Sequence, residues 1–296
     1  MYVPKWHKWH AQMALQESDD MNTYMKFKGG KSRALTFSYD DATVQDIRLM
    51  EIFNRYGLKA TFNINTGCYL PEDAVREKYD GRLKFSEAKE LYTNCGHEIA
   101  VHSLTHPTLS MLTGPEIIYE IIEDRKNIEN TFGTITRGMA YPNGPYNERV
   151  IEAARECGIV YARTINATEN FKLPENWLEL HPTCHHRHPK LMEFADKFLE
   201  EPDNSSTLRL FFVWGHSFNF DREDNWEIIE EFGKKVGGRD DVWYATNIEI
   251  YEYVEAFKSL RKSADGKTFY NPTLIEVWAL DKNGLFSIKP GETVVR

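Results

Sequence analysis

The sequence predicts an α/β protein with about seven parallel β-strands, arranged as a parallel barrel or as a doubly wound sheet. Short apolar runs alternate with segments of helical periodicity from residue 33 to residue 260, which is the pattern of parallel strands joined by helices. Ionisable residues directly follow several of these runs. With 296 residues, 41% of them hydrophobic, the chain has ample material for one large core.

Each predicted strand is a short apolar or β-branched run bounded by polar or turn residues. The first strand leads directly into Asp40 and Asp41, and the third contains the apolar run from Ile99 to Val101. The predicted strands, in order, are residues 33–38, 60–65, 98–102, 138–141, 159–163, 208–214 and 242–245.

The predicted helices carry apolar residues three or four positions apart, and several of them end at a glycine. Pro115 opens one such helix, in which Ile117, Ile121 and Ile128 share a face and Gly133 lies beyond the end. Proline at the start and glycine after the end are the usual helix boundaries. The predicted helices are residues 47–57, 85–95, 115–132, 147–157, 191–199, 226–236 and 248–260.

The pattern changes after residue 266 to two short β segments, residues 273–280 and 285–289, separated by Asp281-Lys-Asn-Gly284. Asn-Gly is a strong turn signal, so these segments predict a β-hairpin. We therefore predict an N-terminal arm (residues 1–30), a barrel (residues 31–262) and a C-terminal β appendage packed on the barrel (residues 263–296). Residues 166–189, which are polar and rich in His and Pro, are predicted to form a long irregular loop.

Composition limits the partners and the location of the protein. A formal net charge of −9 argues against nucleic acid and anionic membranes as partners. The four cysteines are scattered and predict reduced thiols. No signal-peptide core and no segment of membrane-spanning length is visible. We therefore expect a cytoplasmic protein, or a secreted one if a leader has been removed. The sequence specifies no oligomeric state.

The strand at residues 98–102 ends in two histidines four positions apart, His102 and His106, and Pro107 follows them. This spacing can place both imidazoles on one face of a helical turn, and the proline confines that turn to the end of the strand. Two neutral imidazoles can begin a metal site. The same spacing also occurs by chance or in surface caps, so a nearby carboxylate is needed to distinguish the two.

Candidate partners lie at the ends of the other strands. Asp40 and Asp41 end the first strand, Arg163 ends the fifth, and His216 follows the sixth. In a parallel barrel the carboxyl ends of the strands meet at one rim, where the chemistry takes place. One aspartate and two histidines make a three-ligand set that leaves a position open for water on zinc. The remaining carboxylate could act as a base and the remaining histidine as an acid.

Four motifs, in this order, resemble those of the polysaccharide deacetylases, the NodB-homology group or carbohydrate esterase family 4. They are Leu35-Thr-Phe-Ser-Tyr-Asp40-Asp41, His102-Ser-Leu-Thr-His106, Tyr141-Pro-Asn143-Gly144 and Trp214-Gly-His216. The resemblance covers roughly residues 30 to 250. It implies a distorted barrel with fewer than eight β/α units, which agrees with the strands identified above.

The resemblance also implies roles for individual residues. Asp40 would be the catalytic base and His216 the general acid. Asp41, His102 and His106 would bind one divalent metal ion, with zinc expected and cobalt able to replace it. Asn143 would offer its backbone N–H to the oxyanion, and Trp214 would line the pocket for the acetyl methyl group. Further candidates for substrate contact are Tyr141 in the third motif and His185 in the loop Pro182–His188.

The chain departs from the family pattern at two places. Ala140 stands where an arginine usually supports the base, and residues 164–171 lack the expected Asp-Trp motif. We predict that Arg163 pairs with Asp40 instead; the alternative is an ordinary surface ion pair. The histidines of the Pro182–His188 loop could bind a second metal or contact substrate, or they could be surface residues. His97, which precedes the third strand, is expected to be structural.

Three classes of function fit these observations. The first is a metal-dependent hydrolase that removes N- or O-acetyl groups from a polysaccharide or oligosaccharide. The second is an amidohydrolase of a small non-sugar amide or imide, because scaffold and metal do not fix the substrate. The third is an inactive sugar-binding protein, against which the intact candidate base and acid argue.

Overall fold

A computed structural model of the chain describes residues 23–76, 81–200 and 207–296. Most of the predicted N-terminal arm therefore lies outside the described residues. The chain forms two compact units. Of the described residues, the larger unit contains 33–200 and 209–251, and the smaller contains 23–32, 207–208 and 252–296.

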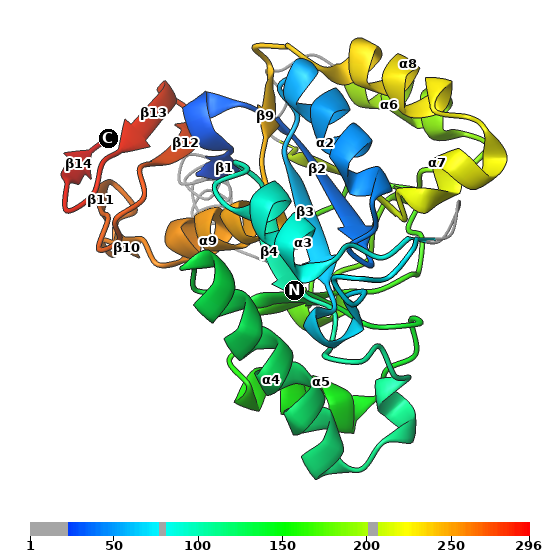
Figure 1. Cartoon of the computed structure of the whole chain (residues 1–296). Helices are drawn as coiled ribbons and strands as arrows, with labels where there is room; N and C mark the ends of the chain where they lie inside the picture. The colour runs from blue at the N-terminus through cyan, green and yellow to red at the C-terminus, as the bar shows by residue number, and fades with distance from the viewer. Residues whose placement is uncertain (1–22, 77–80, 201–206) are drawn as a thin grey trace, which may run out of the picture. The chain divides into compact units, whose positions relative to one another are not determined.

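The larger unit is built on one parallel sheet whose order is β6-β5-β4-β3-β2-β8-β7, with β9 also paired to β2. Figure 1 labels β2, β3, β4 and β9 of this sheet. All seven predicted strands are present, and every pairing is parallel. β2 and β8 are buried along their whole length, as expected for strands covered on both faces. The strands are β2 (Arg33–Asp40), β3 (Ala60–Ile64), β4 (Glu98–Val101), β5 (Gly138–Ala140), β6 (Tyr161–Arg163), β7 (Cys184–His185), β8 (Arg209–Gly215) and β9 (Val242–Tyr244).

One segment of the predicted loop links the two sides of this sheet. Leu180 pairs with Arg163 at the end of β6 in an isolated parallel bridge, and four residues later Cys184 pairs with Val213 of β8. The sheet therefore curls into a distorted barrel, which confirms the predicted fold class. Residues 166–189 were wrongly predicted to lack strands, because β7 is too short to produce a sequence period.

The predicted helices are present, and their boundaries follow local chemistry. α4 begins with a capping box between Thr113 and Glu116 and ends at Gly133, whose φ of 67° suits glycine. α4 packs beside α5, and α6 packs beside α8 (Figure 1). No helix of the described residues is long and apolar enough to cross a membrane. The helices are α2 (Gln45–Arg55), α3 (Phe85–Tyr92), α4 (Gly114–Phe132), α5 (Glu148–Glu156), α6 (Leu191–Glu200), α7 (Phe218–Glu223), α8 (Glu227–Val236) and α9 (Asn247–Lys258).

The smaller unit contains two three-stranded antiparallel sheets. The predicted hairpin is confirmed, with Asp281 opposite Gly284 at its turn. A separate cluster of buried side chains, including Phe269, Val277 and Ile288, forms its core. Its packing on the barrel stays a prediction. The strands are β1 (Tyr24–Lys26), β12 (Val277–Asp281) and β13 (Gly284–Ile288) in one sheet, and β10 (Arg261–Lys262), β11 (Thr268–Tyr270) and β14 (Thr293–Val295) in the other.

Candidate functional site

The candidate site residues gather at the carboxyl ends of the barrel strands. Asp40 is the last residue of β2 and Asp41 follows it. His102 follows β4, Arg163 ends β6, and His216 follows β8. Because the strands are parallel, these five positions lie at one end of the sheet.

Asp41, His102 and His106 form the metal-binding candidate. One ligand atom from each lies within 4.8 Å of the other two. His102 Nδ1 lies 2.9 Å from the carbonyl oxygen of Ala140, so Nδ1 carries the proton and the Nε2 lone pair remains for a ligand. Burial lowers the pKa of His102 to about 4, which keeps the ring neutral. A carboxylate and two imidazoles in this arrangement fit a divalent cation such as zinc.

Asp40 lies beside this set but has different partners. Its Oδ2 contacts Arg163 Nη2, and it lies 3.9 Å from His102 Nε2 and 3.8 Å from His216 Nε2. Its Oδ1 accepts a hydrogen bond of 2.8 Å from Asn63 Nδ2. Burial alone would raise the pKa of Asp40, but Arg163, His102 and His216 lower it to about 2. Asp40 is therefore an ionised carboxylate in a buried site.

The contact between Arg163 and Asp40 is the one expected from the sequence, although its catalytic role stays a prediction. Arg163 is only 1% exposed, and its guanidinium carbon lies 4.4 Å from the centre of the Trp214 ring. This stacking is a cation–π interaction. Trp214 thus supports Arg163 from within the barrel, a role that the sequence did not suggest. Its predicted contact with an acetyl methyl group stays a prediction.

His216 and His185 lie on the β8 side of the site. His216 Nε2 is 3.7 Å from Asp41 Oδ2, and the two histidine rings have centroids 6.3 Å apart. His185 Nδ1 accepts a hydrogen bond of 3.0 Å from the backbone N–H of Arg187, so the proton of its neutral ring is on Nε2. Burial, with His216 and Arg187 nearby, lowers the pKa of His185 to about 3. His185 is therefore a neutral hydrogen-bond donor close to His216.

The two candidate residues of the third motif, Tyr141 and Asn143, differ in their exposure and in their contacts. The Tyr141 side chain is buried, and its hydroxyl donates a hydrogen bond of 2.8 Å to the carbonyl of Leu178, so only its backbone can face a substrate. Asn143 is exposed, and its Nδ2 lies 3.2 Å from Thr108 Oγ1 and 3.4 Å from the carbonyl of His106. Its side chain thus contacts the loop that carries His106. The oxyanion role of its backbone N–H stays a prediction.

Two carboxylates of α4 that the sequence reasoning missed hold the loop with both histidines. Asp124 Oδ2 accepts a hydrogen bond of 3.1 Å from the backbone N–H of His102. Glu120 accepts bonds of 2.8 and 2.7 Å from the backbone N–H and the hydroxyl of Thr105. Both residues are buried on the isoleucine face of the helix. The sequence did contain a signal for them, since two acidic residues lie four positions apart on the apolar face of a predicted helix. Buried charges need partners, so such residues are expected to bind a neighbouring segment.

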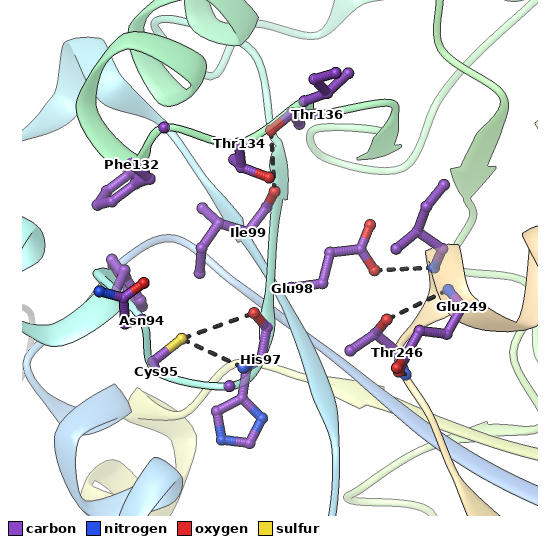
Figure 2. Close-up of a pocket in the computed structure, with 15 residues that line it drawn as sticks. Asn94, Cys95, His97, Glu98, Ile99, Phe132, Thr134, Thr136, Thr246 and Glu249 are labelled. Atoms are coloured by element: carbon purple, nitrogen blue, oxygen red, sulfur yellow. Dashed lines mark hydrogen bonds between the residues drawn. The ribbon is translucent and has the colours of Figure 1, made fainter.

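A separate hollow of about 460 Å³ lies at the opposite end of β4, near His97 and Glu98 (Figure 2). The backbone N–H of Ala60 donates to His97 Nδ1 at 3.2 Å, and the ring contacts Phe53 and Phe62. These contacts agree with the structural role expected for His97. Among the described residues, the three-ligand group of Asp41, His102 and His106 is the cluster that could hold a metal ion.

Part of the chain is similar to known proteins. Residues 27–162 match the family described as polysaccharide deacetylase. A Bacillus subtilis (strain 168) protein named uncharacterized protein YlxY is 31% identical over 109 residues, which is 37% of this chain and 30% of that protein. Chitin deacetylase 1 of Cryptococcus neoformans var. grubii is 34% identical over 95 residues, which is 31% of this chain and 20% of that protein. The alignments thus span less than a third of either relative.

A solved structure shows the same fold. The crystal structure of a candidate polysaccharide deacetylase from Mycobacterium smegmatis superimposes with a TM-score of 0.56 at 18% sequence identity. The superposition covers 79% of this chain and 94% of that chain. The two proteins therefore share a fold, and the candidate site of this chain lies at the carboxyl ends of the barrel strands.

Proposed function

We propose, from the match of residues 27–162 to the polysaccharide deacetylase family, that this protein is a metal-dependent hydrolase that removes acetyl groups from a carbohydrate. The observation that carries the proposal is an ionised, buried carboxylate beside a three-ligand set. Asp40 lies next to Asp41, His102 and His106, and its Oδ2 is 3.9 Å from His102 Nε2. A binding protein would have no use for a buried base in this position.

The proposed reaction is hydrolysis of an N-acetyl or O-acetyl group by water. A divalent ion held by Asp41, His102 and His106 would polarise the acetyl carbonyl and lower the pKa of water. Asp40 accepts the proton of the attacking water, and Arg163 and Asn63 hold the carboxylate in place. His216 protonates the sugar nitrogen or oxygen as the bond to the acetyl carbon breaks. The products are acetate and a free amine or hydroxyl group.

The substrate side of the site has two further candidate contacts. His185 presents a neutral N–H beside His216, which suits a hydrogen bond to a sugar hydroxyl. The backbone N–H of Asn143 would stabilise the oxyanion of the tetrahedral intermediate, and one such donor contributes about 3 kcal/mol. The expected substrate is an acetylated polysaccharide or oligosaccharide, with no nucleic acid or membrane partner.

Acetate release from a panel of compounds tests this proposal. The panel contains N-acetylated chitooligosaccharides, acetylated xylan, and small non-sugar amides and imides. We expect release from one of the carbohydrates, loss of activity after chelation and recovery with zinc or cobalt. Asp41→Asn should lose the metal, measured by elemental analysis. Full activity without metal would contradict the mechanism, and turnover of the non-sugar compounds alone would make the protein an amidohydrolase.

A further inference from the structure

Arg82 and Asn65 form hydrogen bonds that connect Asp41 to the turn carrying His102. Arg82 Nη1 donates to the Asp41 carbonyl at 2.8 Å, and Nη2 donates to Asp41 Oδ1 at 3.1 Å. Arg82 Nη1 also donates to Asn65 Oδ1 at 2.7 Å. Asn65 Nδ2 in turn contacts the carbonyl of His102 and donates to that of Ser103 at 2.9 Å. One continuous network thus runs from Asp41 to the turn that carries His102.

The backbone at both ends of this network is strained. Asp41 has a φ of 86°, and Ser103 and His106 have φ values of 63° and 60°. Residues other than glycine rarely adopt such values, which are strained and persist only where neighbouring groups fix them. Arg82 binds the carbonyl of Asp41, and Asn65 binds the carbonyl of Ser103. The network therefore acts on the residues whose backbone needs external support.

The geometry of Arg82 is specific to a guanidinium. Its two terminal nitrogens hold the carbonyl and the carboxylate of the same residue, Asp41, as well as the Asn65 amide. A planar guanidinium can make these contacts at the same time, whereas the ammonium of lysine is one compact group on a flexible side chain. Asn65 is fully buried, so its amide has these partners in place of water.

We propose that Arg82 and Asn65 are positioning residues of the metal site. Arg82 fixes the Asp41 carboxylate, and Asn65 fixes the His102–Ser103 turn at the distance where both ligands can bind one cation. This inference rests on the metal site of the proposed function and adds two residues to it. Partners that orient a metal ligand typically contribute 10–100-fold to metal affinity. The effect is on affinity because neither residue belongs to the ligand set.

The test measures zinc affinity of metal-free protein by competition with a chromogenic chelator, with no acetylated substrate present. Arg82→Met should weaken zinc binding about tenfold or more, while the melting temperature of the metal-free protein changes no more than in a control variant. Arg125→Met is a matched control, because Arg125 also binds a carboxylate, Glu129, and a carbonyl, Cys157, away from the site. Asn65→Asp, which keeps the acceptor for Arg82 and loses both donations, should also weaken binding.

Arg82→Lys distinguishes the effect of the guanidinium geometry from that of the positive charge. It also provides the test if Arg82→Met does not fold. We expect lysine to recover only part of the zinc affinity, since it keeps the charge and loses the fork. Full recovery with lysine, or a loss no larger than in Arg125→Met, would overturn the inference and leave the proposed function intact. A wild-type protein that binds no zinc or cobalt would overturn both.

Discussion

The two ends of β4 carry similar residues and offer opposite chemistry. At the amino end, His97 and Glu98 adjoin a hollow (Figure 2). At the carboxyl end, His102 lies beside Asp40 and Asp41. Each end thus has a histidine and a carboxylate beside one strand, although Glu98 is only half-buried. The residue types alone therefore do not show which end could bind a metal ion.

At the amino end, the carboxyl group of Glu98 is hydrogen-bonded to neutral donors. Glu98 Oε1 accepts a hydrogen bond from the Tyr161 hydroxyl at 2.7 Å, and Oε2 accepts bonds from Thr61 and the backbone N–H of Ile248 at 2.8 and 3.0 Å. Burial raises the pKa of Glu98 to about 7. The carboxyl group thereby holds the start of α9 through bonds from neutral donors.

At the carboxyl end, lone pairs converge and cations face the carboxylates. The Asp40 carboxylate faces Arg163, and the Nε2 atom of His102 points toward Asp41 and His106. Ligand capacity therefore depends on how the neighbouring groups are oriented and charged, and not on the residue types present. Three predictions test this difference.

The largest effect is expected for the candidate acid and base. Asp40→Asn and His216→Ala should each lower turnover about 10²–10⁴-fold, because each removes one proton transfer. Metal content should stay unchanged, since neither residue is in the ligand set. Turnover and metal content are measured on the same preparations, and His97→Gln at the other end of β4 serves as the control. Loss of metal in Asp40→Asn would mean that the roles of the two aspartates are reversed.

An intermediate effect is expected for Arg163. Arg163→Met should lower turnover about 10–100-fold with metal content unchanged, because Asp40 loses the cation that orients it. Arg163→Lys should recover part of the rate. Its ammonium group can reach the carboxylate, but it lacks the planar guanidinium that stacks on Trp214. Steady-state kinetics with the same acetylated substrate provide the measurement. An unaltered rate in Arg163→Met would show that the ion pair is only structural.

The smallest effect is expected at the amino end of β4 and concerns stability alone. The pKa of Glu98 is raised by burial to about 7, above the value of about 4.3 for an unfolded chain. The folded state therefore prefers the protonated acid, and its stability falls as the pH rises from about 4 through 7. Glu98→Gln does not titrate, so its melting temperature relative to wild type should rise between pH 4.5 and pH 8.

Activity provides the control for this last variant. Turnover of Glu98→Gln at pH 7 should stay within about twofold of wild type, as expected for a position outside the site. A melting-temperature difference that does not change with pH would show that Glu98 is ionised throughout, and that the amino end of β4 holds a charge after all.

The succession of strands and helices along the chain, most helix boundaries and the end of the barrel that carries the ionisable residues could be predicted from the sequence. These features depend on local patterns. The apolar run before His102 predicts a strand, and Pro115 and Gly133 mark the ends of α4. The motif around Asp40 and Asp41 pointed to the family for the same reason, because ligand and base are neighbours in the chain.

The distant side chains around the site depend on the tertiary structure. β6 places Arg163 against Asp40, 123 positions away, and so decides between the pair predicted from the sequence and its alternative, a surface ion pair. Tyr141 turns into the core, and Arg82 reaches Asp41 from a segment with no motif of its own. The directions of these side chains follow from strand pairing and helix packing across the barrel. No local period encodes them, since each contact joins segments that come together only when the sheet curls.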